Sequence, residues 1–221
     1  MSKDVISSSP HLRDNVSTTS IMRDVCIALL PAAVAGVLFF GYRSAIILAL
    51  SVAAAVLSEW LYCKAAHCRN TIGDFSAVVT GMLLAMNLPV SIPLWQAVFG
   101  ALVAIVAVKG LFGGIGKNFA NPAITARIVM FLAFSKTMTA WVFPDAVSSA
   151  TPLAMMANGE SVDYLTLLLG NHGGCLGETS ALALLIGFAY LLIRGVISWH
   201  TPVCFVGTVF VMSLILGQDA V

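Results

Sequence analysis

The stretch Ala45–Leu61, AIILALSVAAAVLSEWL, decides the fold class of this chain. Its only charged residue is Glu59, and every residue before Glu59 is apolar or small and uncharged. A helix needs roughly 17–25 apolar residues to cross a bilayer, which this stretch provides. Because the bilayer interior offers no water to backbone N–H and C=O groups, a spanning segment of this kind must be helical. The stretch therefore predicts a transmembrane helix.

Six more apolar segments flank this stretch on both sides. In chain order they are Cys26–Phe40, Phe75–Met86, Trp95–Val108, Ile124–Phe134, Leu182–Ile193 and Val203–Leu216. Phe75–Met86 is a short segment, since it is closed by Asn87 and Pro89. Together the seven segments predict an all-α fold, a polytopic membrane helix bundle of about seven spans.

The overall composition agrees with a lipid environment. The 221 residues are 59% hydrophobic and only 10% charged, and the mean hydropathy is +0.97. A soluble domain averages about 25% charged residues, so this chain has too few charges to cover a surface that faces water. The net charge is +1, with no basic tract. We therefore expect membrane lipid as a partner and no nucleic acid.

The distribution of basic residues predicts the orientation. The basic residues after the second, fourth and sixth segments are Lys64, Arg69, Lys109, Lys117 and Arg194. Between Lys136 and Arg194 the sequence holds no Lys or Arg. By the positive-inside rule the amino terminus is cytoplasmic, and the long loop is outside. The predicted organisation is a cytoplasmic amino-terminal segment, membrane helices 1–5, an extracytoplasmic loop and membrane helices 6–7, at residues 1–23, 24–137, 138–177 and 178–221 respectively.

A short motif occurs twice in the sequence, each time at the start of a predicted helix. Gly73-Asp74-Phe-Ser-Ala77 opens the third segment, and Gly177-Glu178-Thr-Ser-Ala181 opens the sixth. An acidic residue near a helix amino terminus is favourable through capping and the helix dipole, which is one explanation. In the predicted topology, however, the two copies begin on opposite sides of the membrane. That arrangement is typical of the inverted repeats of transporters.

The outside loop contains a run of small residues with exposed hydroxyl groups. The run is Asp145-Ala-Val-Ser148-Ser149-Ala150-Thr151, followed by Pro152. Proline disfavours helical geometry at the residue before it, so we expect Thr151 to lie outside a helix. The Thr151 hydroxyl is then a plausible acceptor for covalent modification, although composition alone favours a plain loop.

This run resembles the motif at which a flavin transferase joins FMN to threonine through a phosphoester, with Ser149 where glycine is commoner. Three more stretches carry a related resemblance: SPHLR at 9–13, DFSAVVTGMLLAMNLP at 74–89 and FGGIGKNFANPAITAR at 112–127. From about residue 9 to its end the chain resembles the RnfD/NqrB family, and the RnfD branch more than NqrB. The resemblance implies a membrane subunit of the Rnf complex, which couples electron transfer between ferredoxin and NAD to Na+ or H+ translocation.

Further expectations follow from the resemblance alone. It implies FMN esterified to Thr151, with Asp145, Ser148, Ser149 and Ala150 as its recognition motif, and a second, noncovalent flavin, riboflavin. It implies other Rnf membrane and peripheral subunits as partners, including a second subunit with covalent flavin, and a flavin transferase for maturation. It also implies the bacterial cytoplasmic (inner) membrane, and catalysis only as part of the complex. Family members have an inverted-repeat fold similar to urea transporters with about ten spans, so we expect a chain truncated by about three.

The segment 113–118, GGIGKN, does not match a phosphate-binding P-loop, because Leu111 and Asn118 stand at two required positions. We interpret its glycines as sites of close backbone packing. Arg127 follows within the fifth segment, where a charge demands a polar partner. A flavin phosphate or ring carbonyl is the functional interpretation, and a structural ion pair or a snorkelling side chain is the alternative. The weaker candidates for the same cofactor are Lys117, Asn118 and Asn121.

Two acidic residues are candidates for an ion path, Glu59 and Asp74, although helix capping explains Asp74 adequately. Cys63 and Cys68 could form half of a metal site, but no second pair completes it, so we expect no metal. The alternative function for the whole chain is a urea-transporter-like channel or solute transporter without a redox role.

Overall fold

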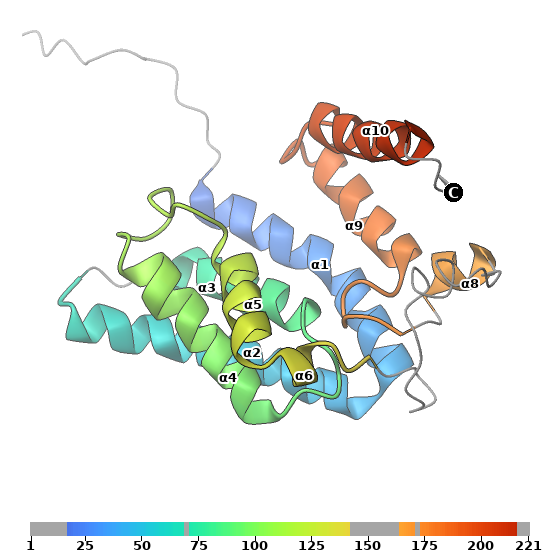
Figure 1. Cartoon of the computed structure of the whole chain (residues 1–221). Coiled ribbons are helices and arrows are strands. Elements are labelled where there is room, and N and C mark those ends of the chain that lie inside the picture. Colours follow the sequence, from blue (N-terminus) through green and yellow to red (C-terminus); the bar gives the residue numbers. More distant parts are fainter. Residues whose placement is uncertain (1–16, 69–70, 142–163, 171–172, 216–221) are drawn as a thin grey trace, which may run out of the picture.

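The computed structural model describes residues 17–68, 71–141, 164–170 and 173–215, and in these ranges it is helical without a strand (Figure 1). The long helices are α1 (Thr18–Phe40) and α2 (Tyr42–Ala65). The shorter elements are η1 (Ile72–Asp74), α3 (Ser76–Met86), α4 (Leu94–Leu102), η2 (Val103–Gly110), α5 (Pro122–Ala133), α6 (Ser135–Met138), α8 (Tyr164–Leu169), α9 (Ala181–Ile193) and α10 (His200–Ile215).

Each of the seven predicted segments coincides with a helix, so the all-α prediction is confirmed. Helices α1 and α2 are long and apolar enough to cross a membrane. Five shorter apolar helices are α3, the continuous α4–η2 rod, α5, α9 and α10. Helix α1 begins at Thr18, earlier than the predicted Cys26, because the Ser17 hydroxyl caps it by accepting from Ser20 N at 3.1 Å. This is the architecture of a helical membrane protein.

The centre of the described structure is helix α2, which packs against α3, α4 and η2. Ile47 of α2, Leu84 of α3, Ile105 of η2 and Met130 of α5 are almost completely buried in one apolar cluster. Gly81 permits the close contact between α2 and α3, since a Cβ at this position would lie 2.7 Å from Val52 Cα. Small residues at helix contacts are typical of membrane bundles.

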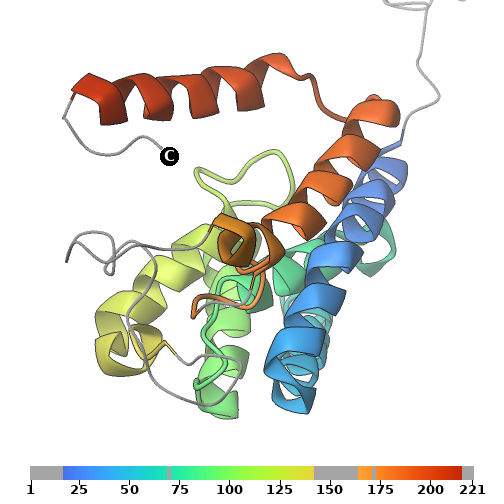
Figure 2. The same cartoon turned by 90° about the vertical axis from the view of Figure 1, so that its right-hand side faces the viewer.

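Helices α1 and α9 form a second unit beside this centre (Figure 2). Near the start of α1 the buried Asp24 accepts hydrogen bonds from Arg194 Nη2 at 3.2 Å and Tyr190 Oη at 3.1 Å, both at the end of α9. Toward the other end of α1, a Cβ at Gly36 would lie 2.5 Å from Leu176 O, just before α9. The two helices therefore run antiparallel.

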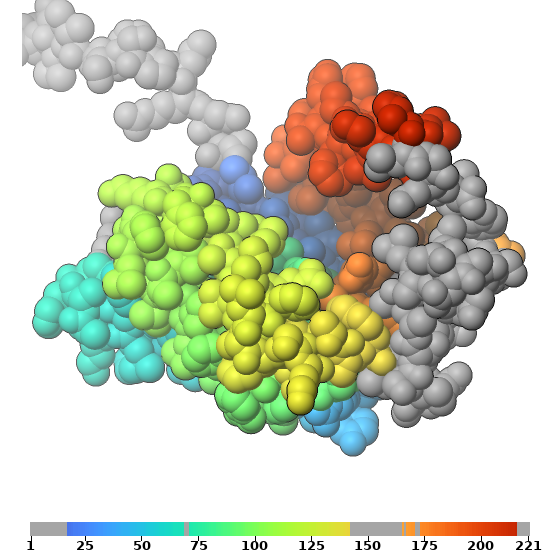
Figure 3. All heavy atoms as spheres, viewed as in Figure 1, coloured from blue at the N-terminus to red at the C-terminus, as the bar shows by residue number. Residues whose placement is uncertain are grey.

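Helix α10 extends from the end of α9 and stands above the rest of the described chain (Figure 3). None of its residues is buried, and its side chains include Val203, Phe205, Phe210 and Ile215. An apolar helix that is exposed all round is incompatible with water as the surrounding medium. Lipid or other protein must cover it.

The interpretation of the glycine-rich segment as a site of close packing is wrong. A Cβ at Gly114 or Gly116 would meet no atom within 4 Å. Both residues, together with Gly113, have positive φ, at 91°, 80° and 95°. Glycine is present because the turn after η2 needs left-handed backbone, which side chains disfavour.

Both copies of the repeated motif lie at the starts of helices, as predicted. Asp74 Oδ1 accepts from Ser76 N at 2.8 Å where α3 begins, and Ser180 Oγ accepts from Ala183 N at 3.3 Å where α9 begins. The first copy lies at the amino end of α3. The second copy lies at the carboxyl end of α3, because Gly177 N donates to Met86 O at 2.9 Å. Helix α9 thus begins close to the carboxyl end of α3, opposite to the end at which α3 itself begins.

Candidate functional site

A buried ion pair lies where α2 and η2 meet. Glu59 projects from α2, and Lys109 lies in the last turn of η2. The distance between Lys109 Nζ and Glu59 Oε1 is 2.6 Å, and the two side chains are only 5% and 4% exposed. The η2 segment is a π-helix, a rare local widening that is frequent at functional sites. Tertiary packing therefore brings together two charges that lie 50 residues apart.

The ion pair continues into the start of α3. Lys109 Nζ also donates to Ser76 Oγ at 2.5 Å, and Ser76 Oγ donates to Asp74 Oδ1 at 2.5 Å. Asp74, one residue before the N-cap Phe75, also accepts from the first backbone N–H of α3, which agrees with the capping interpretation. A continuous chain of polar contacts therefore joins the two predicted ion-path residues, Glu59 and Asp74, through Lys109 and Ser76.

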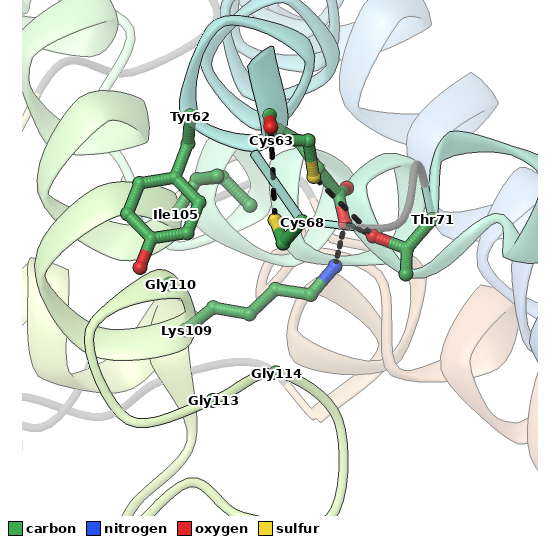
Figure 4. A pocket seen from close by; sticks show the side chains of 10 residues that line it. Tyr62, Cys63, Cys68, Thr71, Ile105, Lys109, Gly110, Gly113 and Gly114 are labelled. Carbon is green, nitrogen blue, oxygen red and sulfur yellow. Dashed lines mark hydrogen bonds and ion pairs between the residues drawn. The ribbon is translucent and has the colours of Figure 1, made fainter. Parts of the chain in front are cut away.

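A cavity of about 300 Å³ adjoins this cluster (Figure 4). Its lining includes Glu59, Lys109, Thr71, Cys63 and Cys68. Thr71 Oγ1 donates to Glu59 Oε1 at 2.5 Å, whereas the other carboxylate oxygen, Oε2, is buried and accepts no hydrogen bond from the described residues. An open acceptor on a buried carboxylate beside a cavity can receive a proton donor or a small cation.

A second polar cluster surrounds Arg127 of α5. Arg127 Nη1 donates to Asn87 Oδ1 at 2.9 Å, and Nη2 donates to Cys175 Sγ at 3.4 Å. These residues border a cavity of about 260 Å³ at the point where the end of α3 meets the segment before α9, together with Glu178. No carboxylate in the described parts of the chain lies within 4.0 Å of the Arg127 guanidinium. The cluster therefore offers a positive charge to an anionic or strongly dipolar group.

The thiol of Cys175, which lies before α9, is protonated at neutral pH. Burial raises its pKa to about 12, although the positive charge of Arg127 acts in the opposite direction. A protonated thiol is a weak acceptor, so Cys175 satisfies the guanidinium geometrically without neutralising it.

The remaining sequence candidates have separate positions. Asn121 caps α5 by accepting from Ala123 N at 3.0 Å, so capping already accounts for its side chain. Lys117 is exposed in the turn after η2, and Asn118 has a buried Oδ1 without a described hydrogen-bond partner. Neither cavity is lined by these three residues. The acceptor run Asp145, Ser148, Ser149, Ala150 and Thr151 lies outside the described residues, so its predicted role stays a prediction.

Several members of both clusters are not predictable from the sequence pattern. The pattern places Lys109 only beside a loop, and it places Ser76 and Asn87 only at the two ends of the third segment. It assigns no role to Thr71 or Cys175. One signal exists for Lys109, because it ends an uninterrupted apolar run. No periodicity could show that it points toward Glu59.

Comparison with known proteins shows that the chain is similar to subunits of ion-translocating oxidoreductase complexes. The model of the NQR2, RnfD, RnfE family matches residues 5–221. The D subunit of the Na+-translocating ferredoxin:NAD+ oxidoreductase complex of Acetobacterium woodii is 45% identical, over 98% of this chain and 70% of its own length. The D subunit of the proton-translocating ferredoxin:NAD+ oxidoreductase complex of Clostridium ljungdahlii is 37% identical, over 96% of this chain and 69% of its own length. The D subunit of the ion-translocating oxidoreductase complex of Halorhodospira halophila is 34% identical, over 93% of this chain and 69% of its own length.

Proposed function

The chain belongs to the NQR2, RnfD, RnfE family, and on that premise we propose that it is the D subunit of an ion-translocating ferredoxin:NAD oxidoreductase complex. The observation that carries this proposal is the match over nearly the whole chain to relatives that are named as this subunit. The protein acts within the complex and is not catalytic alone. Its partners are the other membrane and peripheral subunits, including a second subunit that carries covalent flavin.

We further propose that FMN is joined to Thr151 by a phosphoester, which a flavin transferase forms. The support is the run from Asp145 to Thr151, which matches the acceptor motif except at Ser149. Bound FMN would supply electron transfer, while the protein sets its position and surroundings. In this proposal Thr151 holds the phosphate, and Asp145, Ser148, Ser149 and Ala150 shape the turn that the transferase recognises.

Arg127 is the residue that we assign to a second, noncovalent flavin. The support is its position on a cavity of about 260 Å³ with no ion-pair partner among the described residues. A guanidinium can donate paired hydrogen bonds to a ring carbonyl and stabilise negative charge that develops beside it. Lys117 and Asn118 remain weaker candidates, and Asn121 is weaker still because it caps α5.

For ion movement we propose the chain from Glu59 through Lys109 and Ser76 to Asp74. A path for Na+ or H+ needs a buried acidic group with a free oxygen, and Glu59 Oε2 meets that requirement in the described structure. Lys109 would hold the negative charge in place between transfer events. The coupling ion could be either, since the two named ferredoxin:NAD+ relatives differ in it.

The proposed setting is the bacterial cytoplasmic membrane, with the amino terminus inside, seven spans in this chain and the 138–177 loop outside. The support is the distribution of Lys and Arg. The opposite starting ends of α3 and α9 also suit an inverted repeat like that of urea transporters.

The test of the FMN proposal is a denaturing gel of protein co-expressed with its flavin transferase. We expect a band with flavin fluorescence, and the Thr151→Ala variant should lose it completely. The matched control is Ser149→Gly, which restores the commoner motif residue and should keep the band. Mass spectrometry of the peptide should show the mass of FMN less water on Thr151. An unmodified Thr151 peptide in active, assembled complex would reject the proposal.

The same gel measurement distinguishes the proposed redox function from the alternative function. A channel or solute transporter without a redox role predicts no covalent flavin even when the transferase is present. A fluorescent band that survives Thr151→Ala would instead place the flavin elsewhere and leave the redox function intact.

A further inference from the structure

The carboxyl end of α2 closes with a turn that places two cysteines together. Ala66 N donates to Tyr62 O at 2.8 Å, and Cys68 N donates to Cys63 O at 3.1 Å. His67 between them has a positive φ of 50°. This is the Schellman pattern, in which the residue two after the cap bonds back to the residue three before it. In that pattern the side chains of these two residues are frequently in contact, and here both are cysteines.

The local distances suit a covalent bridge. The backbone hydrogen bond holds the Cα atoms of Cys63 and Cys68 within about 7 Å of each other, given standard bond lengths. Disulfides join Cα atoms that are roughly 4.4–6.8 Å apart. The Cys68 thiol is 3.8 Å from Cys63 O, and its pKa is raised chiefly by a hydrogen bond with the Cys63 side chain. A small adjustment of the turn would therefore bring the two sulfurs into bonding contact.

The two thiols differ in access. Cys68 is exposed, whereas Cys63 is only 8% exposed and borders the cavity of about 300 Å³ beside Glu59 and Lys109 (Figure 4). A reagent in water can therefore reach Cys68 directly, while Cys63 is placed to attack a sulfur that is already activated at Cys68. This division of roles is that of an attacking and a resolving cysteine.

We propose that Cys63 and Cys68 form a reversible disulfide by exchange with a low-molecular-weight disulfide of the glutathione class. The Cys68 thiolate attacks one sulfur of that disulfide, which forms a mixed disulfide and releases one thiol. The Cys63 thiolate then attacks the Cys68 sulfur, which closes the protein bridge and releases the second thiol. The two protein thiols lose two protons and two electrons, and the small disulfide is reduced to two thiols.

The bridge has a consequence for the buried ion pair. Cys63 Sγ lies 4.0 Å from Thr71 Oγ1, and Thr71 donates to Glu59. A bridge to Cys68 withdraws Cys63 from Thr71 and so changes the surroundings of Glu59. Where the proposed ion path holds, oxidation would slow transport through it, a consequence that rests on the proposed function.

The test is thiol counting and mass spectrometry on the full chain or the native complex in detergent. After treatment with oxidised glutathione at mildly alkaline pH, we expect Cys63 and Cys68 to be lost together from the five cysteines that can be alkylated in the denatured protein. The peptides that contain Cys63 and Cys68 should be joined with the loss of two hydrogens, and dithiothreitol should restore both thiols. Because the readout is mass, its outcome does not depend on flavin content or ion transport.

Three variants make the result specific. Cys63→Ser should stop at the mixed disulfide on Cys68, and Cys68→Ser should give no bridge. Cys204→Ser removes another exposed cysteine and should leave the bridge unchanged. A stable mixed disulfide on Cys68 beside a free Cys63 in the unsubstituted protein would overturn the proposal. So would a Cys68 that does not react at all in folded protein.

Discussion

Glu59 is a carboxylate on an otherwise apolar helix, and its burial there as a charged group depends on Lys109. Taking a charge out of water costs several kcal/mol unless a partner and hydrogen bonds compensate. Lys109 supplies the opposite charge at 2.6 Å, and Thr71 supplies a hydroxyl donor. A buried pair of this kind adds little net stability as a whole, but removal of one member leaves the other uncompensated.

We therefore expect Lys109→Met to destabilise the protein by about 3–5 kcal/mol, because Glu59 would remain buried without its counter-charge. Glu59→Gln should also destabilise, while the double variant Glu59→Gln/Lys109→Met should lose much less than the sum. The measurement is the thermal unfolding of detergent-solubilised protein, followed by tryptophan fluorescence. Fully additive losses would show that the two residues are not coupled, contrary to the structure.

At the scale of elements, the contact between α2 and α3 depends on the absence of a side chain. A Cβ at Gly81 would lie 2.7 Å from Val52 Cα and 3.0 Å from Ser51 O, which are both backbone atoms that cannot rotate away. The short α3 carries Ser76 at one end and meets the segment before α9 at the other. Its distance from α2 therefore controls the geometry of both clusters.

Gly81→Ala should cost about 1–3 kcal/mol, since added atoms in a packed contact force the backbones apart. Gly73→Ala is the matched control, because a Cβ there meets nothing within 4 Å and Gly73 does not have positive φ. The control should change stability by no more than about 0.5 kcal/mol. The measurement is the free energy of unfolding of both variants in the same detergent. Equal losses of stability in Gly81→Ala and Gly73→Ala would contradict the close contact between α2 and α3.

The seven apolar helices could be predicted from the sequence because a helix in lipid needs only its own residues to satisfy its backbone. The capping role of Asp74 was also predictable, since capping acts within three or four residues. The role of the glycines at 113–116 could not be predicted, because composition does not distinguish a glycine needed for positive φ from one needed for close packing. The first depends on the local backbone, and the second depends on a neighbouring helix.

At the scale of the whole molecule, the orientation that the basic residues predict can be tested at Cys68. Cys68 is exposed at the end of α2, on the side where the start of α3 and Lys109 lie. If this side is cytoplasmic, a membrane-impermeant maleimide should label Cys68 in inside-out vesicles and not in right-side-out vesicles. The opposite pattern would invert the topology.

The control for this labelling is Cys68→Ser, which should remove the signal that depends on vesicle orientation. Cys63 is a useful internal comparison, because it is buried and should react slowly from either side. Labelling that survives Cys68→Ser with the same sidedness would show that another cysteine reports the orientation.

The membrane medium, the helical class and the approximate place of each helix were determined by the order of residues along the chain, because lipid solvation acts on each segment separately. The family was also determined there, since its motifs are short and contiguous. The pairing of Lys109 with Glu59, the contacts of Arg127 with Asn87 and Cys175, and the antiparallel arrangement of α1 and α9 arose only on folding. Each of these joins residues from different parts of the chain, and which faces of two helices meet is set by the packing of the whole bundle rather than by any one segment.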